Sequence, residues 1–190
     1  MMLPDLYVIR HGETEFNAIG RMQGGLDSRL TNKGREQADV MADKLRGIVG
    51  PNTHDLICSP QGRALATADP ISVATGCPIA PVADLREISM GDWTGLPRSE
   101  IDRRWPAPNP NEHFIEFYAR APKGESFENL WDRVGRVLDG LTRPTVIVTH
   151  GFTSRFLRTR AMGWGMDRIA DLPGKQGAIF QISNGQHKEF

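Results

Sequence analysis

The chain has 190 residues, a length typical of a single domain with a sizeable hydrophobic core. Its 23 basic and 23 acidic side chains cancel, so no overall charge attracts nucleic acid or an anionic membrane, and any anion site must be built locally. The 2 cysteines lie in largely apolar stretches, and neither an export signal nor a membrane span is visible in the sequence. These features predict a reduced, cytoplasmic protein whose partner is a small molecule.

Apolar runs alternate with helical patterns along the chain, which predicts an α/β sandwich in one domain spanning residues 1–190. The expected strands lie at 6–10, 56–59, 79–82, 145–149 and 178–183. The expected helices run from Thr31 to the Gly50-Pro51 pair, from Pro60 to about Ala74, from Ser126 past Leu138, and from Gly151 to Met162. Segment 97–122 is rich in Pro, Asn, Arg and aromatic residues and interrupts this alternation, which predicts a cap-like insertion.

Two histidines, His11 and His150, each follow an apolar run and precede a glycine. Either imidazole alone is equally well explained as a turn residue that bonds its own backbone. The repetition of the pattern, with Arg10 beside the first copy, favours a functional site. Because parallel strands bring their carboxyl ends to one edge of a sheet, we expect the two imidazoles to meet there.

Further side chains reach the same edge if the sheet is parallel. Arg63 lies one helical turn beyond the second strand, and Glu87 follows the third. Taken singly, Arg63 is more typical of a solvated helix face, and Glu87 is equally well explained as the cap of a neighbouring helix. With Arg10 and the histidines they provide what a phosphoryl group requires: guanidinium donors, a nucleophile and a carboxyl group for proton transfer. No paired spacing typical of zinc ligands is present.

The residues of this set belong to longer motifs that follow one another along most of the chain. The motifs are Arg10-His11-Gly12-Glu13-Thr14, Asn17, Gln23-Gly24, Ser59-Pro60 with Arg63, Leu85-Arg86-Glu87, Gly124-Glu125-Ser126 and His150-Gly151. As a set they resemble the histidine phosphatase superfamily in its phosphoglycerate mutase-like branch. The resemblance implies a three-layer α/β/α fold with a mostly parallel central sheet, and catalysis through a phosphohistidine without a metal or other cofactor.

The resemblance also implies a role for each site residue. His11 would accept the phosphoryl group, with its second ring nitrogen fixed by a nearby backbone carbonyl. Arg10, Arg63 and His150 would hold the phosphoryl oxygens, while Glu87 would protonate the leaving alcohol and then take a proton from water. The other expected ligands of phosphate or substrate are Asn17, Gln23, Gly24 and Gly151, and the weaker candidates Thr149 and Gly12 are equally explained by backbone geometry.

Three functions remain open at this point. A mutase must exclude water until the phosphoryl group returns to its substrate, whereas this chain has a short 97–122 segment and only 7 residues after Ser183. We therefore expect a phosphatase acting on a small phosphorylated metabolite, with a phosphoglycerate mutase-type isomerase as the alternative and a noncatalytic phospho-ligand binder as the third. Phe152 stands where the family often has a small residue and is expected to narrow or shift the pocket. The oligomeric state is open, with a homo-oligomer through paired sheet edges as one option.

Overall fold

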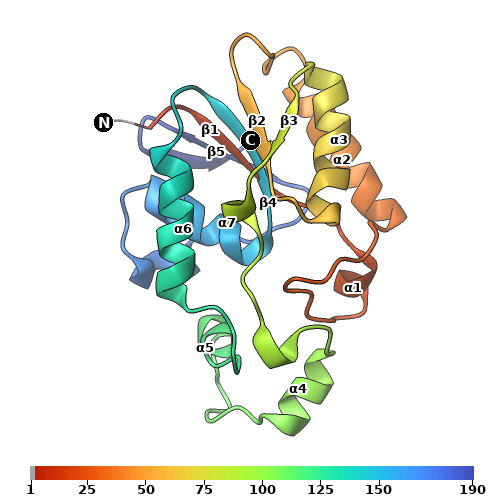
Figure 1. The fold of residues 1–190 in the computed structure, drawn as a ribbon, viewed down its shortest axis with the longest axis vertical. Coiled ribbons are helices and arrows are strands. Elements are labelled where there is room, and N and C mark those ends of the chain that lie inside the picture. Colours follow the sequence, from red (N-terminus) through yellow and green to blue (C-terminus); the bar gives the residue numbers. More distant parts are fainter. Residues whose placement is uncertain (1–2) are drawn as a thin grey trace.

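A computed structural model describes residues 3–190 and contains a mixed sheet of six strands in the order β3-β2-β4-β1-β5-β6. The strands are β1 (Leu6–Arg10), β2 (Asp55–Cys58), β3 (Ile79–Pro81), β4 (Thr145–Thr149), β5 (Ile179–Ser183) and β6 (Gln186–Glu189). The first four in spatial order are parallel to one another. At one edge of the sheet β5 pairs antiparallel with β1, and β6 pairs antiparallel with β5 (Figure 1). The prediction of an α/β fold with a mostly parallel sheet is confirmed.

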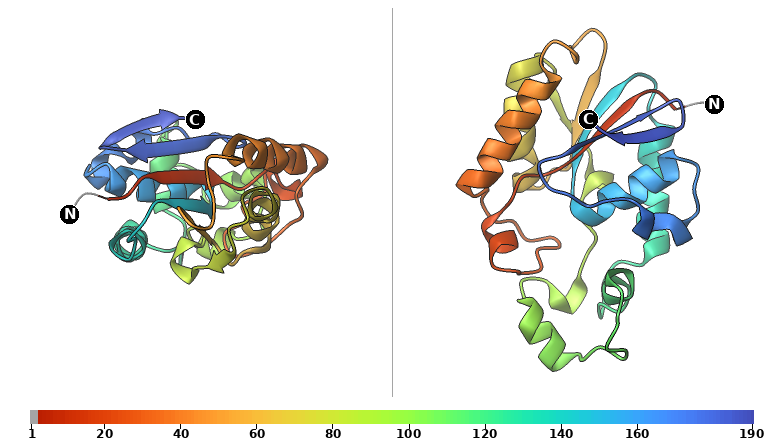
Figure 2. Two further views of the ribbon diagram at one scale, coloured as in Figure 1. Left: turned by 90° about the horizontal axis from the view of Figure 1, so that it is seen from above. Right: turned by 180° about the vertical axis from the view of Figure 1, so that it is seen from behind.

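Each face of the sheet has its own hydrophobic core, because successive strand side chains point to opposite faces. Leu6 and Val8 pack with α6 (Phe127–Asp139) and α7 (Gly151–Ala161). Tyr7 and Ile9 pack with α2 (Asn32–Leu45) and α3 (Gly62–Thr75) on the other face. Figure 2 shows the sheet and its helices from above and from behind. The helices are α1 (Glu15–Ala18), α2 (Asn32–Leu45), α3 (Gly62–Thr75), α4 (Arg98–Arg104), α5 (Phe114–Ala119), α6 (Phe127–Asp139) and α7 (Gly151–Ala161).

Several predicted boundaries differ from the structure for identifiable reasons. Helix α2 ends at Leu45 and not at residue 50, since Gly47 adopts a φ of 75° and turns the chain. Pro60 lies before α3 and not in its first turn, because Asp27 accepts hydrogen bonds from the N–H groups of residues 62 and 63 and caps the helix there. The predicted N-caps Thr31 and Ser126 are confirmed.

Strand β6 was not expected, because its residues Gln186–Glu189 are polar and partly exposed. It forms a hairpin with β5 through Asn184 and Gly185, whose φ angles of 51° and 70° are typical of the tight turns that join antiparallel strands. The Asn-Gly pair was the available sequence signal for this strand.

Segment 97–122 contains α4 and α5 and lies beyond the carboxyl ends of the parallel strands, at the bottom of Figure 1. Ile101 and Phe117 anchor it to the core cluster that includes Trp93. The Trp93 ring lies 4.7 Å from that of Phe117, centroid to centroid. The segment therefore stands at the edge of the sheet where the two histidines were expected.

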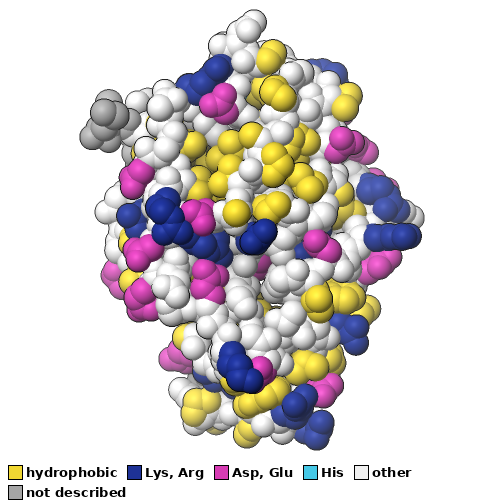
Figure 3. Space-filling model, viewed as in Figure 1, with side chains coloured by type: hydrophobic (Ala, Val, Ile, Leu, Met, Phe, Trp, Pro, Cys, Tyr) yellow, Lys and Arg dark blue, Asp and Glu magenta, His cyan; other side chains and the backbone are white. Residues whose placement is uncertain are grey.

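One side of the molecule carries an apolar surface. Figure 3 shows hydrophobic side chains gathered over the strands between α3 and α6. Ile57 and Val82 are among the partly buried residues that continue the core toward this surface. No helix in the described part of the chain is long and apolar enough to cross a membrane.

A close backbone crossing fixes the end of β1 against the start of α2. A Cβ added to Gly12 would lie 2.3 Å from the carbonyl oxygen of Gly34, and one added to Gly34 would lie 2.0 Å from that of Glu13. Two glycines are therefore needed for the chain to leave β1 along this path, and this path carries His11.

We expect Gly34→Ala to destabilise the protein by about 1–3 kcal/mol, because the new methyl group meets backbone that cannot move aside cheaply. The substitution would otherwise favour a helix by about 1 kcal/mol. Urea unfolding measures the change. Gly50→Ala is the matched control, since its Cβ would meet only the Thr53 hydroxyl, at 3.8 Å. An unchanged free energy of unfolding in Gly34→Ala would contradict the crossing.

Candidate active site

A small cavity of about 70 Å³ lies where β1 ends. Most of the residues predicted for the site line it. They are Arg10, His11, Asn17, Gln23, Gly24, Arg63 and Glu87, joined by Arg21, Met22, Met90 and Tyr118. His150 and Gly151 lie outside this lining set, although the His150 ring centroid is only 5.1 Å from that of His11.

The His11 ring is held in one tautomer. Its Nδ1 lies 2.8 Å from the carbonyl oxygen of Gly12, which can only accept, so Nδ1 carries the proton. Its Nε2 accepts from Nε of Arg63 at 3.3 Å and therefore has a lone pair. Burial, reinforced by the charges of Arg63 and Arg10, holds the pKa of His11 well below its usual value. The ring is thus neutral, with Nε2 free of a proton.

Arg63 is buried at the start of α3, with 1% of its surface exposed. Its Nη1 donates to the Leu26 carbonyl and to Oδ1 of Asp27, both at 2.7 Å, and its Nη2 donates to the Gly24 carbonyl at 3.0 Å. The loop that precedes α2 therefore fixes the guanidinium beside His11. The alternative of a solvated helix-face residue is excluded.

His150 is fully buried at the N-cap of α7. Its Nε2 lies 2.7 Å from Oγ of Ser59, which also accepts from the N–H of Gln61 at 3.3 Å. Among the described residues, Nε2 is the only acceptor within reach of the Ser59 hydroxyl, so the hydroxyl donates to it and the ring proton resides on Nδ1. Within residues 3–190 this Nδ1 has no hydrogen-bond partner. Burial, with charge from His11 and Arg63, keeps the pKa of His150 well below normal.

Arg10 provides a second buried donor that lacks a hydrogen-bond partner among the described residues. Its Nη1 donates to the Gly174 carbonyl at 2.6 Å, while its buried Nε has no partner in the described chain. Gly151 permits this placement, because a Cβ there would lie 3.1 Å from Cζ of Arg10. Buried N–H groups without partners are rare because they cost free energy. Arg10 Nε and His150 Nδ1 are therefore candidate donors to an oxygen atom of a ligand.

Glu87 lies against the start of α7. Its Oε2 accepts from the N–H of Phe152 at 3.2 Å, and its Oε1 accepts from that of Thr153 at 3.0 Å. The backbone N–H of Glu87 itself donates to Oε1 of Gln61 at 2.8 Å. The side chain therefore caps the N-terminus of α7, which is the alternative that the sequence offered, and it also lines the cavity.

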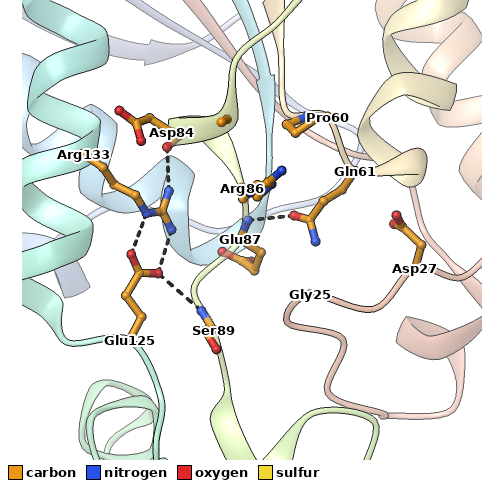
Figure 4. Close-up of a pocket in the computed structure, with 11 residues that line it drawn as sticks. Gly25, Asp27, Pro60, Gln61, Asp84, Arg86, Glu87, Ser89, Glu125 and Arg133 are labelled. Carbon is orange, nitrogen blue, oxygen red and sulfur yellow. Dashed lines mark hydrogen bonds and ion pairs between the residues drawn. The ribbon is translucent and has the colours of Figure 1, made fainter.

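Glu87 also lines a larger hollow of about 630 Å³ (Figure 4). In that view the Gln61 amide points toward the Glu87 backbone, and Glu125 joins Arg133 to Ser89. The smaller cavity is the better candidate for chemistry, because the histidines and the unpartnered donors adjoin it. The mixed charges around the larger hollow are instead largely paired with one another.

Three of the four further predicted ligands, Asn17, Gln23 and Gly24, line the cavity but also have structural contacts. Asn17 accepts through Oδ1 from the N–H of Thr14 at 3.2 Å and from Gln176 at 2.9 Å. Gln23 accepts from the Ser28 hydroxyl at 3.1 Å. Gly24, with a φ of 49°, presents its carbonyl to Arg63. These contacts hold the loop in place beside His11.

Phe152 is not among the residues that line the cavity, so its side chain does not narrow the pocket by direct contact. The ring is buried and stacks on Tyr118 with centroids 4.2 Å apart and an interplanar angle of 13°. Tyr118, from α5, lines the cavity, where burial and the charge of Glu87 raise its pKa to about 12. Phe152 thus affects the cavity through the residue it supports.

Comparison with known proteins gives the family. The sequence profile of the histidine phosphatase superfamily (branch 1) matches residues 6–189. The chain belongs to this superfamily. It is 34% identical over 191 residues to a glucosyl-3-phosphoglycerate phosphatase of Mycolicibacterium vanbaalenii, covering 94% of this chain and 83% of that protein. It is 36% identical over 181 residues to a probable phosphoglycerate mutase GpmB of Escherichia coli, covering 86% and 79%.

Solved structures of relatives have the same fold as this histidine phosphatase superfamily member. A mycobacterial glucosyl-3-phosphoglycerate phosphatase complexed with VO3 superposes with a TM-score of 0.79 at 29% identity, covering 95% of this chain and 91% of that one. YhfR of Bacillus stearothermophilus gives a TM-score of 0.75 at 31% identity, covering 98% and 95%.

Several residues of the site were not predicted from the sequence. Ser59 orients His150, the Gly174 carbonyl orients Arg10, and Gln61 bridges Gly24 and Glu87. The weaker candidates Thr149 and Gly12 have backbone roles. The Thr149 hydroxyl donates to the Leu85 carbonyl at 2.7 Å, and Gly12 leaves room for the Gly34 carbonyl. Only the Ser59-Pro60 motif gave any signal.

Two further observations concern metal binding and cysteine. In the described residues, no group of three or more His, Cys, Asp and Glu side chains could hold a metal ion. Cys58 is a buried strand residue, and burial raises the pKa of its thiol to about 12. A thiol with so high a pKa is a poor nucleophile at neutral pH.

We expect ¹⁵N NMR of the histidine rings at pH 6 to show His11 neutral with an unprotonated Nε2, and His150 neutral as well. Free imidazoles with a pKa near 6.5 would be mostly charged at this pH. The urea-unfolded protein provides the control, in which all rings titrate normally. A protonated Nε2 on His11 at pH 6 would contradict the assigned tautomer.

Proposed function

We propose that this protein is a phosphatase that hydrolyses a small phosphorylated metabolite through a phosphohistidine on His11, without a metal. The observation that carries the proposal is an unprotonated Nε2 on His11 beside two buried donors, Arg10 Nε and His150 Nδ1, that have no partner within residues 3–190. A nucleophile beside fixed oxygen donors is what phosphoryl transfer requires.

In the first step, Nε2 of His11 attacks phosphorus and the ester P–O bond breaks. The bonding pair goes to the leaving oxygen, which takes a proton from Glu87. Arg10, Arg63 and His150 hold the three remaining oxygens, and their charge and N–H groups stabilise the transition state where a metal otherwise would. The Gly12 carbonyl bonded to Nδ1 stabilises the positive charge that develops on the ring.

In the second step, water attacks the phosphohistidine and gives a proton to Glu87. The P–N bond breaks, its electron pair returns to Nε2, and phosphate leaves. Glu87 therefore acts first as an acid and then as a base, and it is protonated again at the end of the cycle.

The substrate proposal draws on the relatives. One is a glucosyl-3-phosphoglycerate phosphatase and another is a probable phosphoglycerate mutase, so phosphate esters of small metabolites are the class to test. The short segment 97–122 favours hydrolysis, because it offers little chain to close the site against water. We treat it as a cap that carries Tyr118 over the cavity.

Incubation with 3-phosphoglycerate, sugar phosphates and p-nitrophenyl phosphate tests the function. We expect release of inorganic phosphate that His11→Ala abolishes while the far-UV circular dichroism stays the same, because no other group supplies the nucleophile. His54→Ala is the matched control and should retain full activity. Interconversion of 2- and 3-phosphoglycerate without phosphate release would establish the mutase instead. Saturable phosphate binding without turnover would establish a binder.

A second prediction concerns the proton donor. Glu87→Gln should slow hydrolysis of alkyl phosphates by about 10²–10⁴-fold, the range typical of general acid catalysis, and that of p-nitrophenyl phosphate much less. The nitrophenolate leaves without protonation, whereas an alkoxide does not. Steady-state kcat/KM for both esters measures the difference. Equal losses on the two esters would contradict an acid role for Glu87.

A further inference from the structure

The hydroxyl of Thr153 lies between two oxygens that compete for its single proton. Its Oγ1 is 2.7 Å from the carbonyl oxygen of Arg86 and 3.0 Å from Oε1 of Glu87. Thr153 itself is fully buried, so water does not complete its hydrogen bonding. A hydroxyl has one proton and donates to one acceptor at a time, and a backbone carbonyl never donates in return.

The two oxygens of Glu87 are held unequally. Oε1 accepts from the N–H groups of Ile88 and Thr153 at 3.1 and 3.0 Å, and the Thr153 hydroxyl is its third neighbour. Oε2 has a single partner among the described residues, the N–H of Phe152 at 3.2 Å. Oε2 is therefore the oxygen with lone pairs left for a proton, and Oε1 is the one that anchors the group.

We propose that Thr153 is a positioning residue whose hydroxyl proton follows the charge on Glu87. When Glu87 is ionised, the hydroxyl donates to Oε1, since a charged acceptor forms the stronger hydrogen bond. When Oε2 carries a proton, Oε1 is a neutral acceptor and the hydroxyl turns to the Arg86 carbonyl. Both protonation states are then satisfied without movement of any heavy atom.

This inference rests on the proposed function, in which Glu87 changes protonation state twice in each turnover. In the first step the Oε2–H bond breaks, a new O–H bond forms on the leaving alcohol, and the negative charge left on Glu87 attracts the Thr153 proton. In the second step water returns a proton to Oε2, and the Thr153 hydroxyl rotates back to donate to the Arg86 carbonyl. Reorganisation of the donor is confined to one rotation about a C–O bond.

A purely structural role for this hydroxyl is the competing explanation, because its bond to Arg86 also ties α7 to the segment that carries Glu87. Other bonds hold the same segment: the N–H groups of Phe152 and Thr153 in α7 donate to Glu87, and the Thr149 hydroxyl in β4 donates to the Leu85 carbonyl at 2.7 Å. If the role were structural, loss of this hydrogen bond would lower the free energy of unfolding and slow the hydrolysis of all substrates by the same factor. It would not shift the pH profile of the step in which Glu87 acts.

Other charged and titratable groups surround Glu87 from every element that packs near it. Toward the cavity they are Arg10, His11, Arg21, Arg63, Tyr118 and His150, and toward the larger hollow they are Asp27, Asp84, Arg86, Glu125 and Arg133. An isosteric Thr153→Val substitution keeps all of these groups. A change in pH dependence would therefore report the hydroxyl alone.

The test is the pH profile of kcat/KM for an alkyl phosphate that the enzyme hydrolyses and for p-nitrophenyl phosphate. In Thr153→Val we expect the limb governed by Glu87 to move to higher pH by about one unit, because the ionised form has lost a donor. We expect kcat for the alkyl ester to fall about tenfold, that for the aryl ester about threefold or less, and KM to stay the same.

Thr153→Ser keeps the hydroxyl and should restore the original profile. Thr159→Val is the matched control on the same helix, since the Thr159 hydroxyl is buried and has no partner within residues 3–190. It should leave the profile unchanged. Thr153→Ala serves as the second variant if Thr153→Val folds poorly, with thermal unfolding as the check.

Equal losses on both esters at every pH, with the limb unmoved, would overturn the role of Thr153 and leave the proposed function intact. Failure of the proposed function has a different signature. In that case Glu87→Gln itself would show no dependence on the leaving group, and the comparison of the two esters in the parent enzyme would already reveal it.

Discussion

The pairing of β1 with β4 is the constraint on which the site depends. The two strands are parallel neighbours in a register that sets Arg10 opposite Thr149, and the N–H of His11 continues the ladder to the Thr149 carbonyl at 2.9 Å. Both strands therefore end at the same level, and the residues that follow them, His11 and His150, emerge side by side. A shift of one residue in this register would send one imidazole to the opposite face of the sheet.

The charges of the site are arranged to remain available to a ligand. Arg10 is held by the carbonyl of Gly174, and a carbonyl fixes a guanidinium without neutralising it. Arg63 does pair with Asp27, but that carboxylate is 40% exposed and water weakens its field. In the proposed function, a phosphoryl dianion entering the cavity would meet cations whose charge has been oriented but not cancelled. The same positive field, with burial, lowers the pKa of both imidazoles and would keep the proposed nucleophile neutral.

The sequence was informative where function requires particular residues in continuous motifs. The strand ends around His11 and His150, the caps Thr31 and Ser126, and the α/β class all follow from local pattern. What the sequence could not provide are contacts between distant segments through backbone atoms. The carbonyl of Gly174 lies 164 residues from Arg10 and has no side-chain signature. The stacking of Phe152 on Tyr118 was likewise invisible, because the direction of a side chain depends on packing across the whole fold.

The loop before α2 forms one hydrogen-bonded unit with Gln61, Arg63 and Glu87. The Gly24 carbonyl accepts from Arg63 at 3.0 Å and from Nε2 of Gln61 at 2.8 Å, and Oε1 of Gln61 accepts from the Glu87 backbone. In the proposed function, a substitution that moves this loop would also move the groups that surround phosphorus. Because a displacement of about 1 Å can cost about a hundredfold in rate, selectivity and turnover would then be coupled through a single carbonyl oxygen. Variation in the side chains of the loop, with its backbone unchanged, would be the route to a new substrate that keeps the proposed chemistry.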